Sequence, residues 1–172
     1  SSIVIFIVSF SEKESLHNII WWLLGNLQIF DGGLLAFVAV MVLAGTAAAY
    51  IFSNELNAFA LGEEEAAHIG VDTERMKMAL FLTASMITGA SVAAAGMIGF
   101  VGLIVPHFMR MVVGPDHKIL IPSSFLAGGV FLLVCDTAAR TLMPPAEIPV
   151  GVITAAFGAP FFIHMLRKKS RL

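Results

Sequence analysis

An apolar run from Met78 to Met109 constrains the fold of this chain more than any other feature. The run has 32 residues and contains no Asp, Glu, Lys or Arg. As one α-helix it would be about 48 Å long. A bilayer core of about 30 Å would hold it only at a tilt near ~50°, beyond the usual range of about 0–40°. The second half also contains helix-breaking residues: Gly96, Gly99, Gly102 and Pro106. We therefore predict two crossings here, the second short and irregular.

Three further apolar stretches are each long enough for one crossing. They are LLAFVAVMVLAGTAAAYIF (34–52), ILIPSSFLAGGVFLLVC (119–135) and IPVGVITAAFGAPFFIHML (148–166). Apolar residues make up 58% of the chain and charged residues only 13%, against about 45–50% and 25% in soluble domains. The predicted fold class is all-α: a polytopic transmembrane helical bundle with about five crossings, forming one domain over residues 1–172.

The first residues also indicate a membrane protein. IVIFIVSF (3–10) is apolar but has only eight residues, too few for a crossing that needs about 20. No basic region precedes it and no small-residue cleavage site follows it, so it is a poor signal peptide. We interpret it as the tail of a preceding helix, and we expect the chain to be part of a longer protein.

The placement of Lys and Arg predicts which loops face the cytoplasm. With two crossings in 78–109, eight of the ten basic residues fall on one side: Arg75, Lys77, Arg110, Lys118, Arg167, Lys168, Lys169 and Arg171. A single crossing would divide them seven against three. We therefore expect 53–77, 110–118 and the C-terminus to be cytoplasmic, with 11–33 and 136–147 outside. Two tryptophans in HNIIWWLLGNL (17–27) favour a short interfacial helix in the first outer loop over a hydrated loop.

Small residues repeat every four positions on two of the predicted helices. One set is Ser85, Gly89 and Ala93, and the other is Gly151, Ala155 and Ala159. Such faces let membrane helices approach closely. The alternative is that Gly and Ala are simply common in membrane helices.

Few residues suited to chemistry lie in the predicted spans. Ion-coupled carriers and intramembrane hydrolases need acids or bases at depth, whereas Asp136, Arg140 and His164 lie near span ends. The chain has no HExxH, GxSxG or GxxxxGK[ST] motif, and its five histidines are scattered. A net charge of −2 gives no basic footprint for nucleic acid. We expect no enzyme activity, no metal, no cofactor and no nucleic-acid partner.

The segment SNELNAFALGEEEAAHIGVDTER (53–75) is the clearest docking element. Ser53 or Asn54 can cap a first short helix, Gly62 allows a turn, and three glutamates favour the start of a second helix. Gly70 ends that helix, and Asp72 can cap the next span. Two short helices with an apolar side could fit a groove on a partner. A solvated amphipathic linker is the alternative.

The chain resembles the FecCD-type permeases. The resemblance is carried by FALGEEEAAHIGVD (59–72), by GMIGFVGLIVPHFMRMVVGPDHKILIP (96–122) and by DTAARTLMPPAEIPVGVITAAFGAPFFIHMLRKK (136–169). These permeases are membrane subunits of bacterial ATP-driven importers for ferric siderophores, haem and cobalamin. Family members have about ten helices and pair with a second permease subunit. They bind ABC ATPase subunits inside and a substrate-binding protein outside. The resemblance covers their C-terminal half.

The resemblance also assigns roles to residues. The ATPase-coupling helices fall on 54–70, with these residues at the contact: Leu61, Gly62, Glu63, Glu64, Ala67 and Gly70. The GFVGLIVPH-R signature falls on residues that we expect to pack a short helix: Gly99, Phe100, Gly102, Pro106, His107 and Arg110. The outer ARxxxxPxExP stretch assigns Arg140 and Glu147 to docking of the binding protein. A local salt bridge between Arg140 and Asp136, four residues earlier, is the simpler role for Arg140.

The function that the resemblance implies is a permease subunit of an ATP-driven importer for metal chelates. It would lie in the inner or plasma membrane of a bacterium or archaeon, with lipid around it and its C-terminus in the cytoplasm. Alternating access would be driven by a separate ATPase. Two alternatives remain open, namely half of an ion-coupled secondary carrier and a purely structural membrane subunit.

Overall fold

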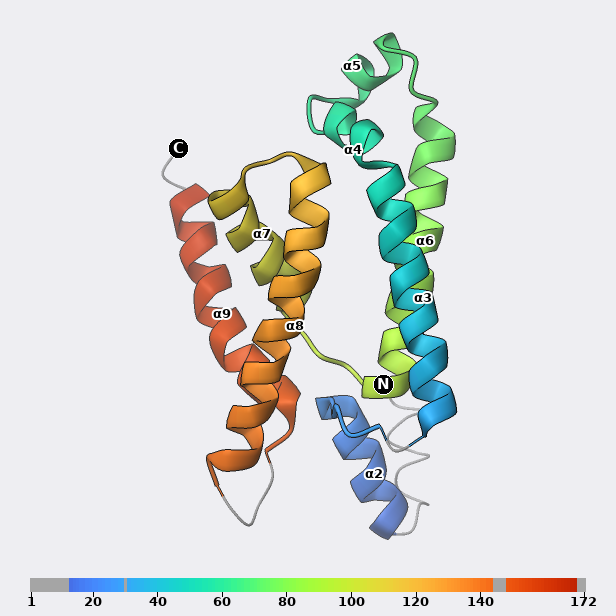
Figure 1. Cartoon of the computed structure of the whole chain (residues 1–172). Coiled ribbons are helices and arrows are strands. Elements are labelled where there is room, and N and C mark those ends of the chain that lie inside the picture. The colour runs from blue at the N-terminus through green and yellow to red at the C-terminus, as the bar shows by residue number, and fades with distance from the viewer. Residues whose placement is uncertain (1–12, 30, 144–147, 170–172) are drawn as a thin grey trace.

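The computed structural model describes residues 13–29, 31–143 and 148–169. Within these ranges the chain forms α-helices and no strands (Figure 1). The helices are α2 (Lys13–Leu24), α3 (Gly32–Ile51), α4 (Ser53–Phe59), α5 (Glu63–His68), α6 (Thr73–Ala95), α7 (Val101–Val113), α8 (His117–Thr141) and α9 (Val150–Lys169). The predicted all-α fold is confirmed.

Three helices, α3, α6 and α8, are long and apolar enough to cross a membrane. α7 and the Val150–Ile163 part of α9 are shorter apolar helices, so five helices match the five predicted apolar segments. Many of their large apolar side chains point outward, for example Ile51, which is 71% exposed, and Phe81, which is 70% exposed. Helices with so little buried apolar surface suit contact with lipid or with further helices, and the fold is a helical membrane bundle.

The long apolar run is divided between two helices, as predicted. α6 ends at Ala95 and α7 begins at Val101. Gly96 and Phe100 have φ angles of +71° and +68°, so both ends of the break use left-handed backbone. α7 then runs back toward the end of the molecule that carries α4 and α5, which we call the α4–α5 end (Figure 1). This end also holds the α7–α8 turn, because the His117 amide donates to Asn57 Oδ1 of α4 at 2.9 Å.

The break is narrower than the sequence suggested. Gly102 and Pro106 lie inside α7, which continues to Val113. Proline removes one backbone hydrogen bond but does not by itself end a helix. The interruption is therefore confined to residues 96–100, and α7 is a regular helix about 20 Å long.

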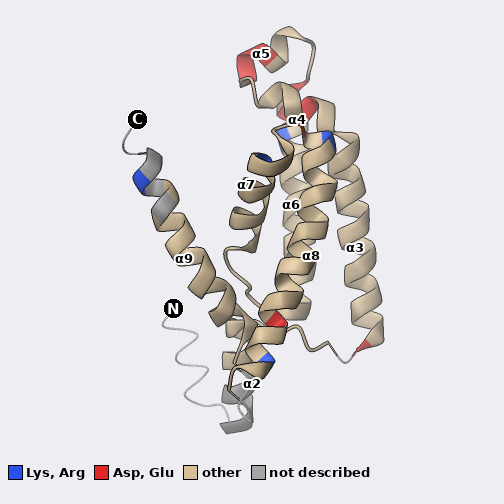
Figure 2. Cartoon of the chain, turned by 60° about the vertical axis from the view of Figure 1, so that its left-hand side comes forward, with Lys and Arg blue, Asp and Glu red and all other residues tan. Residues whose placement is uncertain are grey.

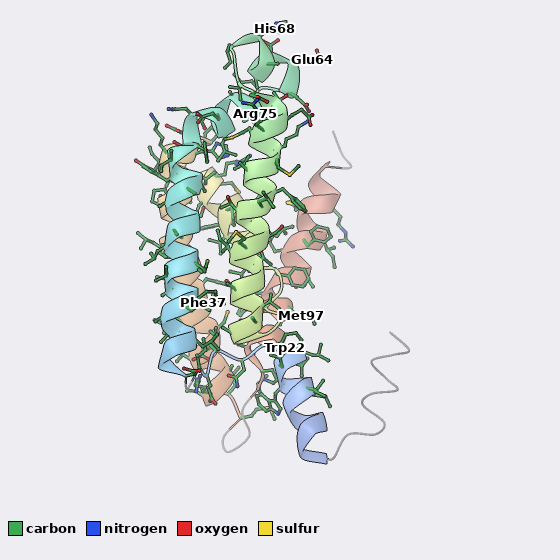
Figure 3. All side chains as sticks on the ribbon, turned by 90° about the vertical axis from the view of Figure 1, so that its right-hand side faces the viewer. Trp22, Phe37, Glu64, His68, Arg75 and Met97 are labelled. Carbon is green, nitrogen blue, oxygen red and sulfur yellow. The ribbon has the colours of Figure 1, made fainter. Side chains whose placement is uncertain are left out.

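The backbone at the break is hydrogen-bonded to the last turn of α2 and to the residues that follow it. Asn26 N donates to Ala95 O at 2.8 Å, and Met97 N donates to Trp22 O at 3.4 Å. Figure 3 shows Trp22 and Met97 side by side. A Cβ atom on Gly96 would overlap Trp22 O, so glycine is needed there both for space and for its positive φ. The short helix predicted in 17–27 is confirmed as α2. Its last turn is hydrogen-bonded to the chain between α6 and α7.

Of the two predicted small-residue faces, the structure shows a close backbone approach at Gly151 and none at Gly89. A Cβ atom on Gly151 would overlap Leu24 O, so α9 begins directly against the chain that leaves α2. A Cβ atom on Gly89 would meet no atom within 4 Å. Nearby, a small core joins α8 to α9, and it consists of Cys135, Ala139, Val150 and Ile153. The first helical turn of α9 is thus fixed between α8 and the α2–α6 junction.

This packing predicts a stability difference between two glycine substitutions. Gly151→Ala places a methyl group against the Leu24 backbone, and we expect a loss of about 1–3 kcal/mol in the free energy of unfolding. Gly129→Ala in α8 is the matched control, because its Cβ would meet no atom within 4 Å. The only cysteine, Cys135, is buried, so a thiol-reactive dye reports thermal unfolding in detergent. Equal unfolding temperatures for the two variants would contradict the close approach at Gly151.

Candidate functional site

The candidate site is the α4–α5 unit, which projects beyond α3 and α6 (Figure 1). Phe52 alone separates α3 from α4, and the Phe52 amide donates to Ala48 O while Phe52 O accepts from Leu56 N. Phe52 is therefore the N-cap of α4, and no side chain caps this helix. The predicted cap by Ser53 or Asn54 is wrong, because α4 follows α3 too directly to leave those residues outside the helix.

The other turns of the unit form as predicted. Gly62 has a φ of +130° and precedes α5, and Gly70 has a φ of +90° and follows it. Asp72 caps α6 by accepting a hydrogen bond from Arg75 N at 3.1 Å. These two positive φ angles favour glycine and give the chain its sharp turns before and after α5.

Burial divides the unit into an inner and an outer surface. Ala58 and Ala66 are buried, with Ala66 fully inaccessible. Leu61 is 76% exposed and Ile69 68% exposed, and Ala67 is also exposed. Figure 3 shows Glu64 and His68 at the tip. Most of the residues assigned to ATPase coupling are exposed at this surface: Leu61, Glu63, Glu64, Ala67 and Gly70. Gly62 is half-buried.

A salt bridge ties α5 to α6. The Lys77 ammonium group bonds the Glu63 carboxylate, and it also lies 3.8 Å from Glu74. Both side chains of the Lys77–Glu63 pair are about half exposed, so solvent screens the pair and its contribution to stability is small. Glu63 thus has a partner within the chain, whereas Glu64 lies at the tip. Of the glutamates at the start of α5, Glu63 therefore joins α5 to α6, and Glu64 contributes charge to the outer surface of the unit.

Asn57 connects α4 to the N-terminus of α8. Its Nδ2 donates to Asp116 Oδ1 at 2.8 Å. Its Oδ1 accepts from His117 N at 2.9 Å and lies 2.7 Å from His117 Nδ1. Asp116 is the N-cap of α8 and accepts from Lys118 N at 3.0 Å. The hydrogen bond from Asn57 and the cap bond lower the pKa of the Asp116 carboxyl group.

Sequence reasoning missed this contact. GPDH (114–117) before an apolar run is a recognisable helix start, and it identifies Asp116 as a cap. The partner lies about 60 positions earlier, and one sequence has no signal that pairs two such distant polar residues. Asn57 is therefore a finding of the structure.

At the opposite end, Arg140 forms a two-point contact with Asp136. Arg140 Nε donates to Asp136 Oδ2 at 2.8 Å and Nη2 donates to Oδ1 at 3.0 Å. The local salt bridge considered from the sequence is therefore present. Its existence does not exclude docking, because the Arg140 side chain is 38% exposed. Glu147 lies outside the described residues.

The GFVGLIVPH-R signature contributes some contacts and leaves other positions open. The Phe100 side chain lies against Gly158 of α9, where a Cβ atom would overlap it. The His107 ring meets Phe161 edge-on at 5.8 Å between centroids. Gly99 and Gly102 face open space, and Arg110 is exposed in the last turn of α7. Packing by the whole signature stays a prediction, and the contacts with α9 described here are those of Phe100 and His107.

Comparison with known proteins identifies the family. The FecCD transport family model matches residues 1–168, so the chain belongs to the FecCD transport family. This confirms the resemblance found in the sequence.

Curated relatives are named as permeases. The chain is 44% identical over 164 residues to the cobalamin import system permease protein BtuC of Halobacterium salinarum, covering 95% of this chain and 44% of that protein. It is 37% identical over 159 residues to the hemin transport system permease protein HmuU of Yersinia pestis, covering 92% and 48%. The chain spans about half the length of the curated relatives it matches.

A solved structure has the same arrangement of helices. It is described as an inward-facing conformation of a metal-chelate type ABC transporter, and it matches with a TM-score of 0.83 and 34% identity. The match covers 97% of this chain and 54% of that one.

The burial pattern of α5 predicts opposite outcomes for two neighbouring alanines. Ala66→Leu must place extra atoms in a fully buried position, which costs about 1–3 kcal/mol and opens the unit. Ala67→Leu is the matched control, because Ala67 is exposed. We expect a glutamate-specific protease to cleave the Ala66→Leu variant in 53–75 about tenfold faster, as ~1.4 kcal/mol implies. Equal cleavage rates for both variants would contradict the described orientation of α5.

Proposed function

We propose that this chain forms part of the permease of an ATP-driven importer for a metal chelate, haem or cobalamin. Support comes from relatives named as cobalamin, hemin and siderophore transport permeases, at 34–44% identity. The chain itself carries out no chemical reaction in this proposal. ATP hydrolysis occurs on separate ABC ATPase subunits.

The observation that carries the proposal is the projecting α4–α5 unit in a chain of the FecCD family. The unit exposes Leu61 and Ile69, and it also exposes Ala67 and Glu64. Exposed apolar side chains rimmed by polar ones are typical of a protein interface. We assign this surface to the ATPase, whose nucleotide-dependent closure would move the unit and drive alternating access of the permease.

The distribution of charge supports the orientation. Figure 2 shows Lys and Arg positions near α4 at the ends of α6, α7 and α8, and another at the far end of α8. The helix ends near α4 carry Arg75, Lys77, Arg110 and Lys118, whereas the last turn of α8 carries Arg140. An excess of Lys and Arg marks cytoplasmic loops. We therefore propose that the α4–α5 end and the C-terminus face the cytoplasm, in the inner or plasma membrane of a bacterium or archaeon.

The proposal assigns other surfaces to the remaining partners. The extracytoplasmic binding protein would dock at the opposite end, with Arg140 and Glu147 contributing. The exposed apolar faces of the helices would contact lipid and a second permease subunit. Half of an ion-coupled carrier, the alternative from sequence, has less support, because the named relatives and the solved structure are ABC or import-system permeases.

The first test of this function is Ala67→Arg in the assembled importer. A bulky cation on the tip should reduce co-purification of the ATPase at least tenfold, or about 1.4 kcal/mol, while the permease stays folded. Met143→Arg is the matched control for ATPase retention alone, because Met143 is exposed at the end opposite to the α4–α5 unit. Unchanged ATPase retention and ATP-dependent uptake in the Ala67→Arg variant would reduce the unit to a linker. Uptake driven by an ion gradient alone would support the carrier alternative.

The second test separates the two roles of Arg140. Arg140→Glu should weaken docking of the binding protein and alter its salt dependence, since rim charges mainly govern association rate. The double variant Asp136→Arg with Arg140→Asp keeps a local pair but removes arginine from position 140. If Arg140 docks, both variants bind the partner less tightly, by several-fold. Recovery of normal docking in the double variant would leave Arg140 as a helix-end residue only.

A further inference from the structure

Two side-chain contacts attach the α4–α5 unit to the helices that cross the membrane. Glu63 and Lys77 join α5 to α6, which is the next helix along the chain. Asn57 joins α4 to α8, about 60 residues away. The first contact closes a local hairpin. The Asn57 contact joins α4 to α8, which follows α6 and α7 in the sequence.

The Asn57 contact is directional. Its amide donates to the cap residue Asp116 and accepts from the first helical amide, His117 N. Ser53 and Ala58 of α4 are buried. Close packing around such residues resists any movement that would press α4 further into its neighbours. Two hydrogen bonds through opposite atoms of one amide also resist separation and rotation, because their strength depends on distance and angle. Asn57 can therefore move the end of α8 in either direction.

α8 extends this contact to the far end of the molecule. It has 25 residues, or about 37 Å at 1.5 Å per residue. Near its C-terminus, Cys135 and Ala139 pack against Val150 and Ile153 of α9. The helix thus links α4 at one end to a packed helix junction at the other. Rigid elements joined by hydrogen bonds are the physical means by which distant sites couple.

We propose that Asn57 is the positioning residue through which movement of the α4–α5 unit is transmitted to α8. The inference rests on the proposed function and adds a defined transmission point to it. Asn57 acts through Asp116 and His117 and contacts neither nucleotide nor cargo in this account. Without it, the ATPase still binds the exposed tip, and α4 stays attached to α3, but α8 no longer follows the unit.

The test is Asn57→Asp in the complete importer, reconstituted with its ATPase and binding protein. The new carboxylate faces that of Asp116, whose Oδ1 lies 2.8 Å from Asn57 Nδ2, so repulsion separates α4 from α8. We expect ATPase co-purification and ATP hydrolysis to persist, while cargo transported per ATP falls at least fivefold. Asn54→Asp is the matched comparison, because it makes the same change at an exposed position of α4 that is not among the residues assigned to the ATPase contact. We expect cargo transported per ATP to fall clearly less in Asn54→Asp than in Asn57→Asp.

A second substitution tests whether the effect passes through Asp116. Asp116→Asn removes the repulsion and supplies an amide that can donate to the carboxylate introduced by Asn57→Asp, so the double variant should regain most of the lost coupling. Asn57→Ala removes the hydrogen bonds of this side chain to Asp116 and His117 without adding charge. It should also uncouple the importer, which keeps the test valid if Asn57→Asp fails to fold.

The results can contradict the role of Asn57 and the proposed importer function separately. Normal cargo per ATP in both Asn57 variants, or a defect that Asp116→Asn leaves unchanged, would overturn the role of Asn57. Failure of the unmodified permease to retain an ATPase, or transport without ATP hydrolysis, would instead overturn the proposed function.

Discussion

The rest of this fold depends on how the chain satisfies its backbone at residues 96–100. Hydrocarbon offers no hydrogen-bond partners, so non-helical backbone in a membrane protein must be covered by protein or face water. The last turn of α2 supplies Trp22 O, and the chain just after α2 supplies Asn26 N, to the backbone around this break. Because the break is supported, α6 and α7 run in opposite directions. The α7–α8 turn therefore lies against α4 at one end of the molecule.

Once the two ends are defined, their chemistry differs. One end carries the projecting α4–α5 unit, most of the described basic residues and the Asn57 contact (Figure 2). The other end carries α2, the glycine-dependent junction at Gly96 and Gly151, and the Asp136–Arg140 pair. α8 runs between them and makes contacts at both. This division is the basis of the proposed docking of one partner on each side of the membrane.

Features governed by local sequence were predictable. Length and composition defined the helices, the 78–109 run indicated its own break, and glycine at 62 and 70 indicated turns. Contacts between distant segments were not. No local pattern links Asn57 to His117, or Gly96 to Trp22, since each depends on how the helices assemble. The sequence also could not predict that Ala66 is buried and Ala67 exposed, because a six-residue helix is too short to show a clear periodicity of apolar residues.

The central claim is that α6 and α7 return the chain to one side, so that 53–75 and 110–118 share the cytoplasmic face. Single cysteines at Glu64, Lys118 and Met143, each exposed and each introduced with Cys135→Ala, test this in sealed vesicles of defined orientation. An impermeant thiol reagent should label Glu64→Cys and Lys118→Cys only from the cytoplasmic side, and Met143→Cys only from the other. Labelling of Glu64→Cys and Lys118→Cys from opposite sides would contradict the account.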